Sequence, residues 1–171
     1  MSDCCSINKA PAFPAVVMSC PACGGRLKQV KPLTVKSLVP HLPFEMAPAQ
    51  YYYCEAAACD VVYFPWNSEA PTFRRSDLLV LVGVKETVEF ALVCYCFGVT
   101  RRQICDEIRQ TGKSAVAERI KAEVKTGNCA CEVENPSGRC CLGDVIRAGQ
   151  EALRVPNSSR QNTLGAGCSG S

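Results

Sequence analysis

The chain has 171 residues and a formal net charge of +3, with 47% hydrophobic and 20% charged residues. This balance is typical of one or two small soluble domains, and the small net charge argues against binding to nucleic acid or to a membrane surface. No apolar stretch approaches the ~18 residues of a transmembrane helix. The start, MSDCCSINKAPAF, lacks the basic and apolar regions of a signal peptide. We therefore expect a cytoplasmic protein.

Cysteine is the unusual component, with 14 residues in the chain, whereas His41 is the single histidine. In a secreted protein so many cysteines would indicate a disulfide framework, but in a reducing compartment metal thiolates are the better interpretation. With one histidine, any metal site must consist almost entirely of sulfur. Such ligands suit zinc, iron-sulfur clusters and Cu(I).

The first half of the chain is predicted to be rich in β-structure. We expect a flexible lead-in over residues 1–18 and a β-rich, zinc-binding domain over 19–90. Two β-branched apolar runs, VVYF at 61–64 and DLLVLVGV at 77–84, are predicted strands. The prolines between 32 and 48 predict a loop.

The second half, residues 91–154, is predicted to be helical. Thr100 and Gln103 form a candidate capping box for a helix that continues to Gln110 and stops at Gly112. Two further helices are expected over 114–125 and 142–153. The last has one apolar side made of Leu142, Val145, Ile146 and Leu153. Small and polar residues at 155–171 predict a disordered tail. The predicted fold class is thus α+β, a β-rich half followed by a helical half.

Two cysteine pairs in the β-rich half have the spacing of a zinc site. Cys20 and Cys23 stand in CPACGG, and Cys54 and Cys59 follow in CEAAAC after 30 intervening residues. Each pair on a tight turn can direct two sulfurs to one tetrahedral ion, as in a zinc ribbon. Gly24 supplies the left-handed backbone that such a turn often needs. The second pair is more widely spaced than is usual.

The same segment also matches a Cu(I)-binding string, M-x-C-x-x-C, beginning at Met18. That motif opens a helix, however, and the two glycines after Cys23 would begin a helix badly. It would also leave Cys54 and Cys59 without a role. We therefore favour zinc.

The second cysteine set begins with Cys94 and Cys96, at the end of the apolar run FALVCYCFG. In an extended segment these side chains point to the same side, so both sulfurs could bind one iron. Four further cysteines follow the first two helices. A [2Fe-2S] cluster needs four thiolates, and we select Cys94, Cys96, Cys131 and Cys141, with Cys129 and Cys140 as the alternates.

The order C-x-C, helix pair and cysteines leading into a helix resembles bacterioferritin-associated ferredoxin, a small helical [2Fe-2S] fold. The loop from Glu132 to Arg139 departs from the closer C-x-x-C of that family. The start of the last helix and Arg139 would both place positive charge near the cluster.

Across residues 18–148 the chain also resembles the N-terminal domain of the CopZ copper chaperones, on the segments CPACGG, CEAAACDVVYF, FRRSDL, VKETVEFALVCYCFGVTRRQI, TGKS and CEVENPSGRCCLGDV. The resemblance implies a mononuclear zinc bound by the first cysteine set and a [2Fe-2S] cluster bound by the second. It implies reduction of Cu(II) to Cu(I), which in that family passes to a heavy-metal-associated domain.

After Leu153 only a short polar tail follows, so we expect a form of the family that lacks this copper-carrying domain. Cys4, Cys5 and Cys168 are candidate mobile thiols for a soft metal ion, or exposed cysteines without a task.

The predicted function is therefore a one-electron redox protein of metal homeostasis, which reduces Cu(II) or hands on a soft metal ion such as Cu(I). Expected partners are a redox protein or a metal transporter or chaperone, with no nucleic acid and no membrane. No acid–base pair, catalytic triad or phosphate loop stands out. Two alternatives remain open: an iron-sulfur cluster carrier or sensor, and a zinc-ribbon regulatory protein.

Overall fold

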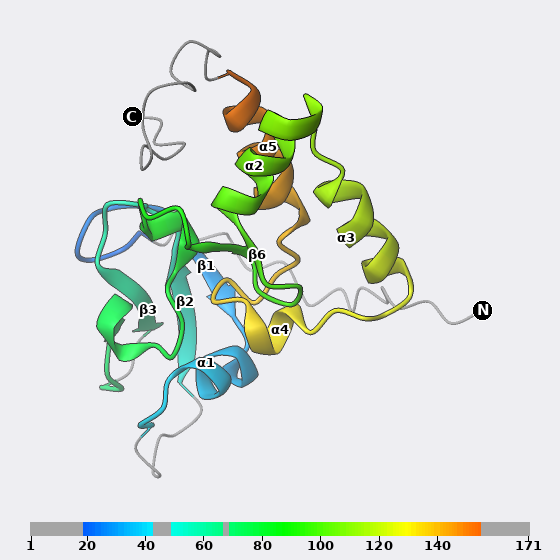
Figure 1. The fold of residues 1–171 in the computed structure, drawn as a ribbon. Helices are drawn as coiled ribbons and strands as arrows, with labels where there is room; N and C mark the ends of the chain where they lie inside the picture. Colours follow the sequence, from blue (N-terminus) through cyan, green and yellow to red (C-terminus); the bar gives the residue numbers. More distant parts are fainter. Residues whose placement is uncertain (1–18, 43–48, 67–68, 155–171) are drawn as a thin grey trace.

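The computed structural model describes residues 19–42, 49–66 and 69–154. A β-sheet with one short helix comes first, and a layer of helices follows (Figure 1). The elements, in chain order, are β1 (Leu27–Val30), α1 (Pro32–Leu38), β2 (Gln50–Cys54), β3 (Val61–Trp66), β4 (Phe73–Arg74), the 3-10 turns η1 (Arg75–Asp77) and η2 (Gly83–Lys85), β5 (Leu92–Cys94), β6 (Val99–Thr100), α2 (Arg101–Thr111), α3 (Val116–Lys125), α4 (Cys131–Glu134) and α5 (Leu142–Arg154). The expected α+β class, with the sheet first, is confirmed.

The first half is built on a four-stranded antiparallel sheet in the order β1-β2-β3-β4. The predicted strand at 61–64 is confirmed as β3. Aromatic side chains suit a pleated, half-buried surface, and Tyr51, Tyr53, Tyr63 and Phe73 form much of the core beside the sheet. In the register of β1 and β2, Leu27 lies opposite Cys54. This pairing brings the loop with Cys20 and Cys23, just before β1, close to Cys54.

The proline-rich loop predicted from residue 32 is partly wrong, because its first seven residues form helix α1. Pro32 occupies the start of this helix, where its missing N–H would have had no helical partner in any case. Thr34, Val35 and Leu38 are buried by the helix. A proline at a helix start favours the helix that a proline in its interior would break.

The strand predicted at 77–84 is also wrong. The segment begins at the end of η1 and ends in η2, and the apolar Leu79 and Leu81 are 64% and 57% exposed. Its backbone bonds to separate partners instead of a neighbouring strand: Leu79 N–H donates to Leu38 O, and Gly83 N–H donates to Tyr95 Oη. The segment therefore links the two halves of the molecule.

The three predicted helices are present as α2, α3 and α5. Thr100 Oγ1 accepts from Gln103 N–H and the Gln103 side chain accepts from Thr100 N–H, so the capping box is confirmed. Gly112, with φ of 77°, ends α2 as expected. Helices α2 and α5 lie side by side, with α3 next to them (Figure 1).

The predicted apolar side of α5 is only partly correct. Val145, Ala148 and Ala152 are the buried residues of this helix, whereas Ile146 and Leu153 are 44% and 53% exposed. Small side chains let two helix backbones approach closely, so alanines, not the larger apolar residues, face the core shared with Ile104 and Ile108 of α2.

The segment around α4 packs against the sheet half, although it belongs to the second half in sequence. Tyr63 Oη donates a buried hydrogen bond of 2.8 Å to Pro136 O, across 73 residues. Lys31, just before α1, forms an ion pair of 2.5 Å with Glu132. The predicted boundary at residue 90 is therefore crossed by contacts from the segment that carries Cys131.

The predicted lead-in (1–18) and tail (155–171), with Cys4, Cys5 and Cys168, lie outside the described residues. Within the described part of the chain, no helix is long and apolar enough to span a bilayer.

Candidate metal centres

The first cysteine set stands on two loops, called knuckles below. The first knuckle, residues 20–25, is a tight loop that precedes β1. Gly24 N–H donates to Cys20 O at 2.7 Å, and Cys20 N–H donates to Gly25 O at 2.8 Å, so the loop closes on itself. Gly24 has φ of 68°, the left-handed conformation expected from the sequence. Cys20 and Cys23 are thereby held on one side of the loop.

The second knuckle begins at Cys54, the last residue of β2, and closes at Cys59. Cys59 N–H donates to Ala56 O at 3.2 Å, and Glu55 N–H donates to Arg26 O at 3.3 Å. The pairing of β1 with β2 therefore places this loop against the first knuckle.

The four sulfurs of Cys20, Cys23, Cys54 and Cys59 all lie within 4.8 Å of one another. The Sγ atoms of Cys20 and Cys59 are 3.9 Å apart, and those of Cys23 and Cys54 are 3.7 Å apart. Four thiolates around a tetrahedral zinc ion at ~2.3 Å would be separated by about 3.8 Å. The donor set and its spacing thus fit a mononuclear zinc ion.

Burial and hydrogen bonding affect the thiols of this set differently. Cys20, Cys54 and Cys59 are almost fully buried, whereas Cys23 is exposed. Burial raises the pKa of Cys54 to about 12 and also raises the pKa of Cys59. The N–H of Gly25, which donates to Cys23 Sγ at 3.3 Å, lowers the pKa of Cys23. Cys23 is therefore easier to ionise for a metal than Cys54 or Cys59.

Gly25 occupies the closest approach between the two knuckles. A Cβ at this position would lie 3.0 Å from Ala56 Cβ and 3.1 Å from Cys23 Sγ. A larger residue would therefore need these neighbours to shift by a few tenths of an ångström, so glycine suits the close packing of the two knuckles.

The second cysteine set is built on β5 and the turn after it. Cys94 is the last residue of β5 and is fully buried. The extended segment predicted to include both cysteines ends there, because residues 95–98 form a turn that leads into β6. Cys96 therefore lies in a turn, so the predicted alternation of an extended strand does not apply to it.

The structure brings Cys131 and Cys141 to this hairpin. The Sγ atoms of Cys96 and Cys131 are 3.5 Å apart. The interaction between the Cys94 and Cys141 thiols lowers the pKa of Cys94 to about 7 and raises that of Cys141. Burial raises the pKa of Cys131. Each cysteine of the C-x-C motif is thus paired with one cysteine from the later segment.

The second set has a different geometry from the first. Among the described residues, the first set is the only group of three or more potential metal ligands whose donor atoms all lie within 4.8 Å of one another. In the second set, Cys96 instead lies next to Cys131, and Cys94 interacts with Cys141. Two pairs of thiolates are the donor arrangement that a two-iron cluster needs, with two protein ligands for each iron.

The alternates lie at the margin of this site. Cys140 is exposed and Cys129 is half-buried, and no sulfur–sulfur contact joins either to another described cysteine. Cys141 directly precedes α5, and its carbonyl accepts the N–H of Val145 at 3.0 Å, so its sulfur is near the positive end of that helix.

A cavity of about 780 Å³ lies between the sheet half and the helical half, beside the second set. Tyr95 lines it, as do Cys140, Asp144 and Glu151. Burial raises the pKa of Tyr95 to about 12, and it also raises the pKa of the Asp144 carboxyl. Of the cysteines in the second set, Cys140 is the one that lines the cavity.

Two residues that hold these sites were not found from the sequence. Lys85 donates to the second knuckle, and Tyr95, between Cys94 and Cys96, accepts from Gly83 N–H and donates to Leu81 O at 2.9 Å. A single lysine or tyrosine in a mixed segment carries no spacing signal, so only the fold identifies them.

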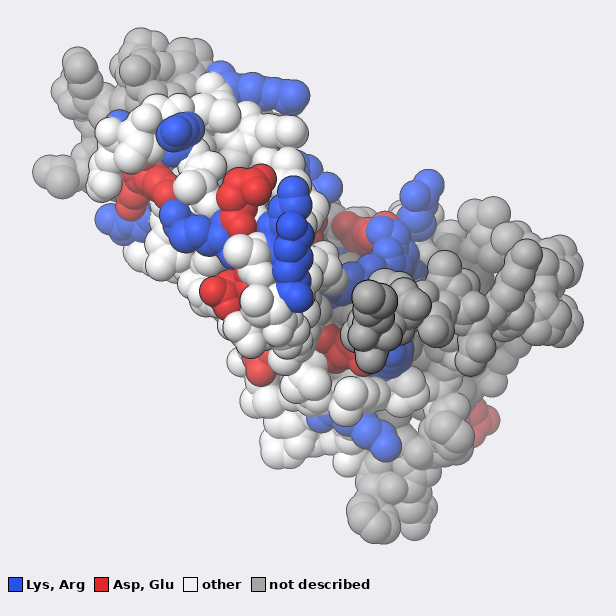
Figure 2. Space-filling view, turned by 90° about the vertical axis from the view of Figure 1, so that its right-hand side faces the viewer, with Lys and Arg blue, Asp and Glu red and all other residues white. Residues whose placement is uncertain are grey.

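The surface charges are mixed in sign. On the face shown in Figure 2, acidic and basic side chains alternate over the described part of the chain and form no single basic field. Elsewhere in the described part of the chain, surface ion pairs join Arg119 with Glu107 and Arg102 with Asp106. This face lacks the continuous basic patch that a nucleic-acid-binding surface needs.

Comparison with known proteins gives concordant results. Residues 17–79 match the zinc-binding domain family named for CopZ. The chain is 36% identical over 133 residues to the copper chaperone CopZ of Archaeoglobus fulgidus, a match that covers 78% of this chain and 62% of that relative. The X-ray structure of the N-terminal domain of the same protein matches with a TM-score of 0.61 at 37% identity, covering 77% of this chain and 98% of that domain.

Proposed function

The chain belongs to the family of the CopZ N-terminal domain, and from this premise we propose that it is a one-electron redox protein of copper homeostasis. In this proposal Cys20, Cys23, Cys54 and Cys59 bind a structural zinc ion. A [2Fe-2S] cluster is bound by Cys94, Cys96, Cys131 and Cys141. The chain spans 62% of the length of its curated relative, so the activity of the whole relative is part of the proposal.

The observation that carries the proposal is the contrast between the two cysteine sets. The first set converges on one point, with sulfur separations of 3.7 and 3.9 Å between its pairs. The second set forms two pairs, one of them 3.5 Å apart. A mononuclear ion accounts for the first arrangement, and a two-iron centre accounts for the second.

When bound, a [2Fe-2S] cluster supplies one-electron chemistry, so its reduced form can give up one electron and convert one Cu(II) to one Cu(I). The chain's own residues set the conditions for this exchange. Burial of Cys94 and Cys141 keeps water from the centre, and the start of α5 places positive charge beside it. In this proposal the copper substrate enters through the cavity lined by Cys140, the residue before Cys141.

In this proposal the protein acts in the cytoplasm, where thiols stay reduced. Its partners are copper carriers or transporters. The name of the relative, a copper chaperone, supports copper as the substrate. On the face shown in Figure 2, the mixed charges give no support to the alternative of a nucleic-acid-binding zinc ribbon.

Absorption spectroscopy of the protein purified without oxygen tests the cluster. We expect visible absorption and about two irons and one zinc per chain. Serine substitution of Cys94, Cys96, Cys131 or Cys141 should abolish the absorption, while Cys129→Ser and Cys140→Ser should keep it. A colourless protein with one zinc would refute the cluster assignment.

Copper reduction is tested by mixing the dithionite-reduced protein, freed of excess reductant, with Cu(II). We expect re-oxidation of the cluster absorption and one Cu(I), captured by a Cu(I)-specific chelator, for each cluster. Absence of Cu(I) would refute the reductase role. Transfer of the iron and sulfide to an apo-ferredoxin would instead support the cluster-carrier alternative.

A further inference from the structure

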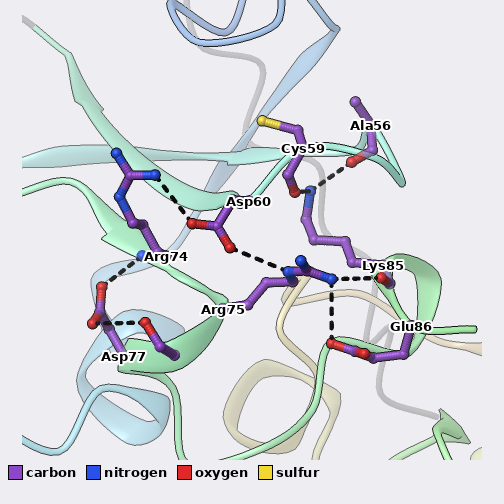
Figure 3. A network of polar contacts seen from close by, with 9 residues as sticks. Ala56, Cys59, Asp60, Arg74, Arg75, Asp77, Lys85 and Glu86 are labelled. Atoms are coloured by element: carbon purple, nitrogen blue, oxygen red, sulfur yellow. Dashed lines mark hydrogen bonds and ion pairs between the residues drawn. The ribbon is translucent and has the colours of Figure 1, made fainter. Parts of the chain in front are cut away.

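Lys85 is a buried lysine whose ammonium group contacts the second knuckle of the first cysteine set. The residue is 5% exposed and ends the turn η2. Its Nζ donates to Ala56 O at 2.7 Å and to Cys59 O at 3.1 Å. Figure 3 shows the side chain reaching up between these two carbonyl groups from the segment below.

The two hydrogen bonds close the wide second knuckle. Four residues separate Cys54 from Cys59, the upper end of the usual spacing of two to four in zinc sites. Ala56 O accepts from both Cys59 N–H and Lys85 Nζ, so the lysine adds a second clamp to the turn. The lysine thereby compensates for the additional length of the loop.

The charge of Lys85 has no carboxylate partner among the described residues. The nearby acidic groups have other partners: Asp60 pairs with Arg74 and Arg75, and Glu86 pairs with Arg75 (Figure 3). Burying an ammonium group is costly unless negative charge lies near it. Four thiolates around one Zn²⁺ carry a net double negative charge, and they are held by the loop that Lys85 contacts.

We propose that Lys85 is a positioning residue and the counter-charge of the four-cysteine site, which stabilises the metal-bound thiolates and sets how firmly they hold the metal. The inference rests on the proposed zinc site.

The surroundings hold Lys85 in this position. Arg75 donates to Lys85 O at 2.9 Å and forms an ion pair of 3.2 Å with Asp60, which directly follows Cys59. Two residues before Lys85, Gly83 N–H is bonded to Tyr95 Oη. A Cβ on Gly83 would lie 1.9 Å from Leu92 O, so the lysine's segment is packed tightly against β5.

Zinc affinity, measured by chelator competition, tests the proposal. Lys85→Met removes charge and hydrogen bonds, Lys85→Gln keeps a donor without the charge, and Lys85→Arg keeps the charge. The matched control is Lys121→Met, on the exposed side of α3. We expect the Met and Gln variants to bind zinc about 10- to 100-fold more weakly, and the Arg and control variants to stay near wild type.

A second measurement separates the charge from simple packing. Loss of a counter-charge makes metal-bound thiolates more nucleophilic, so Lys85→Gln should release zinc several-fold faster when iodoacetamide alkylates the protein. Zinc affinity of Lys85→Gln equal to wild type would overturn the proposal, as would equal weakening in the Arg and Gln variants. Wild-type protein that binds no zinc would refute the zinc site itself, an outcome distinct from these.

Discussion

Removal of one hydroxyl group, in Tyr63→Phe, tests how the sheet half and the second cysteine set are joined. Tyr63 is fully buried in β3, and its Oη donates to Pro136 O at 2.8 Å. Pro136 is itself fully buried and lies between Cys131 and Cys141. The hydroxyl therefore ties the segment that brings these two cysteines to the sheet.

The expected cost follows from the carbonyl that remains. With the hydroxyl gone, Pro136 O stays buried without a donor, and an unsatisfied buried polar group costs about 1–3 kcal/mol. Urea denaturation of the zinc-loaded protein should show this loss with an unchanged slope. The cluster absorption of the variant should also decay faster in air, because the segment carrying its ligands is less firmly held.

Tyr52→Phe is the matched control, because Tyr52 lies in the neighbouring strand β2 and no hydrogen bond joins its hydroxyl to another described residue. It should change the free energy of unfolding by less than about 0.5 kcal/mol. Equal stability of the Tyr63→Phe and Tyr52→Phe variants would show that the Pro136 bond does not hold the halves together.

Three further predictions concern other parts of the chain. Gly149→Ala, in the interior of α5 where an added Cβ meets nothing within 4 Å, should raise the free energy of unfolding by about 0.5–1 kcal/mol; a lower thermal midpoint would contradict this. Gly25→Ala forces a Cβ to 3.0 Å from Ala56 Cβ and should weaken zinc binding in a chelator titration; unchanged affinity would show that the knuckles can separate freely. Glu107→Gln removes the pairing with Arg119 that lowers the carboxyl pKa, and should cost at most about 1 kcal/mol above pH 4.5. This difference should vanish as the pH falls through the lowered pKa, because the wild-type carboxyl is then protonated too; a difference that persists there would refute the ionic origin.

The helices and the first cysteine set could be predicted because their signals are local. Thr100 and Gln103 cap α2 through contacts within one turn, and Cys20 and Cys23 lie in one closed loop. A structure that depends on contacts among a few neighbouring residues can form in many different folds, so its sequence pattern predicts it. The donor spacing of the first set also agrees with the ion that the sequence predicts.

Two of the incorrect predictions depend on distant contacts. The apolar run at 77–84 has strand composition, but it pairs with no strand among the described residues, and its backbone bonds to Leu38 and Tyr95 instead. In α5, Ile146 and Leu153 suggest the apolar side, yet the close approach of α2 selects Ala148 and Ala152 for burial. Composition identifies apolar residues, but packing partners decide which of them are buried.

The segment mispredicted as a strand is also what connects the two cysteine sets. Tyr95, between Cys94 and Cys96 of the second set, bonds to both Leu81 O and Gly83 N–H. Lys85 follows Gly83 by two residues, and its ammonium group contacts the second knuckle of the first cysteine set. A regular strand would use these backbone groups in a sheet ladder. Because the segment forms no ladder, its backbone is available to join a buried charge beside one set to a tyrosine beside the other.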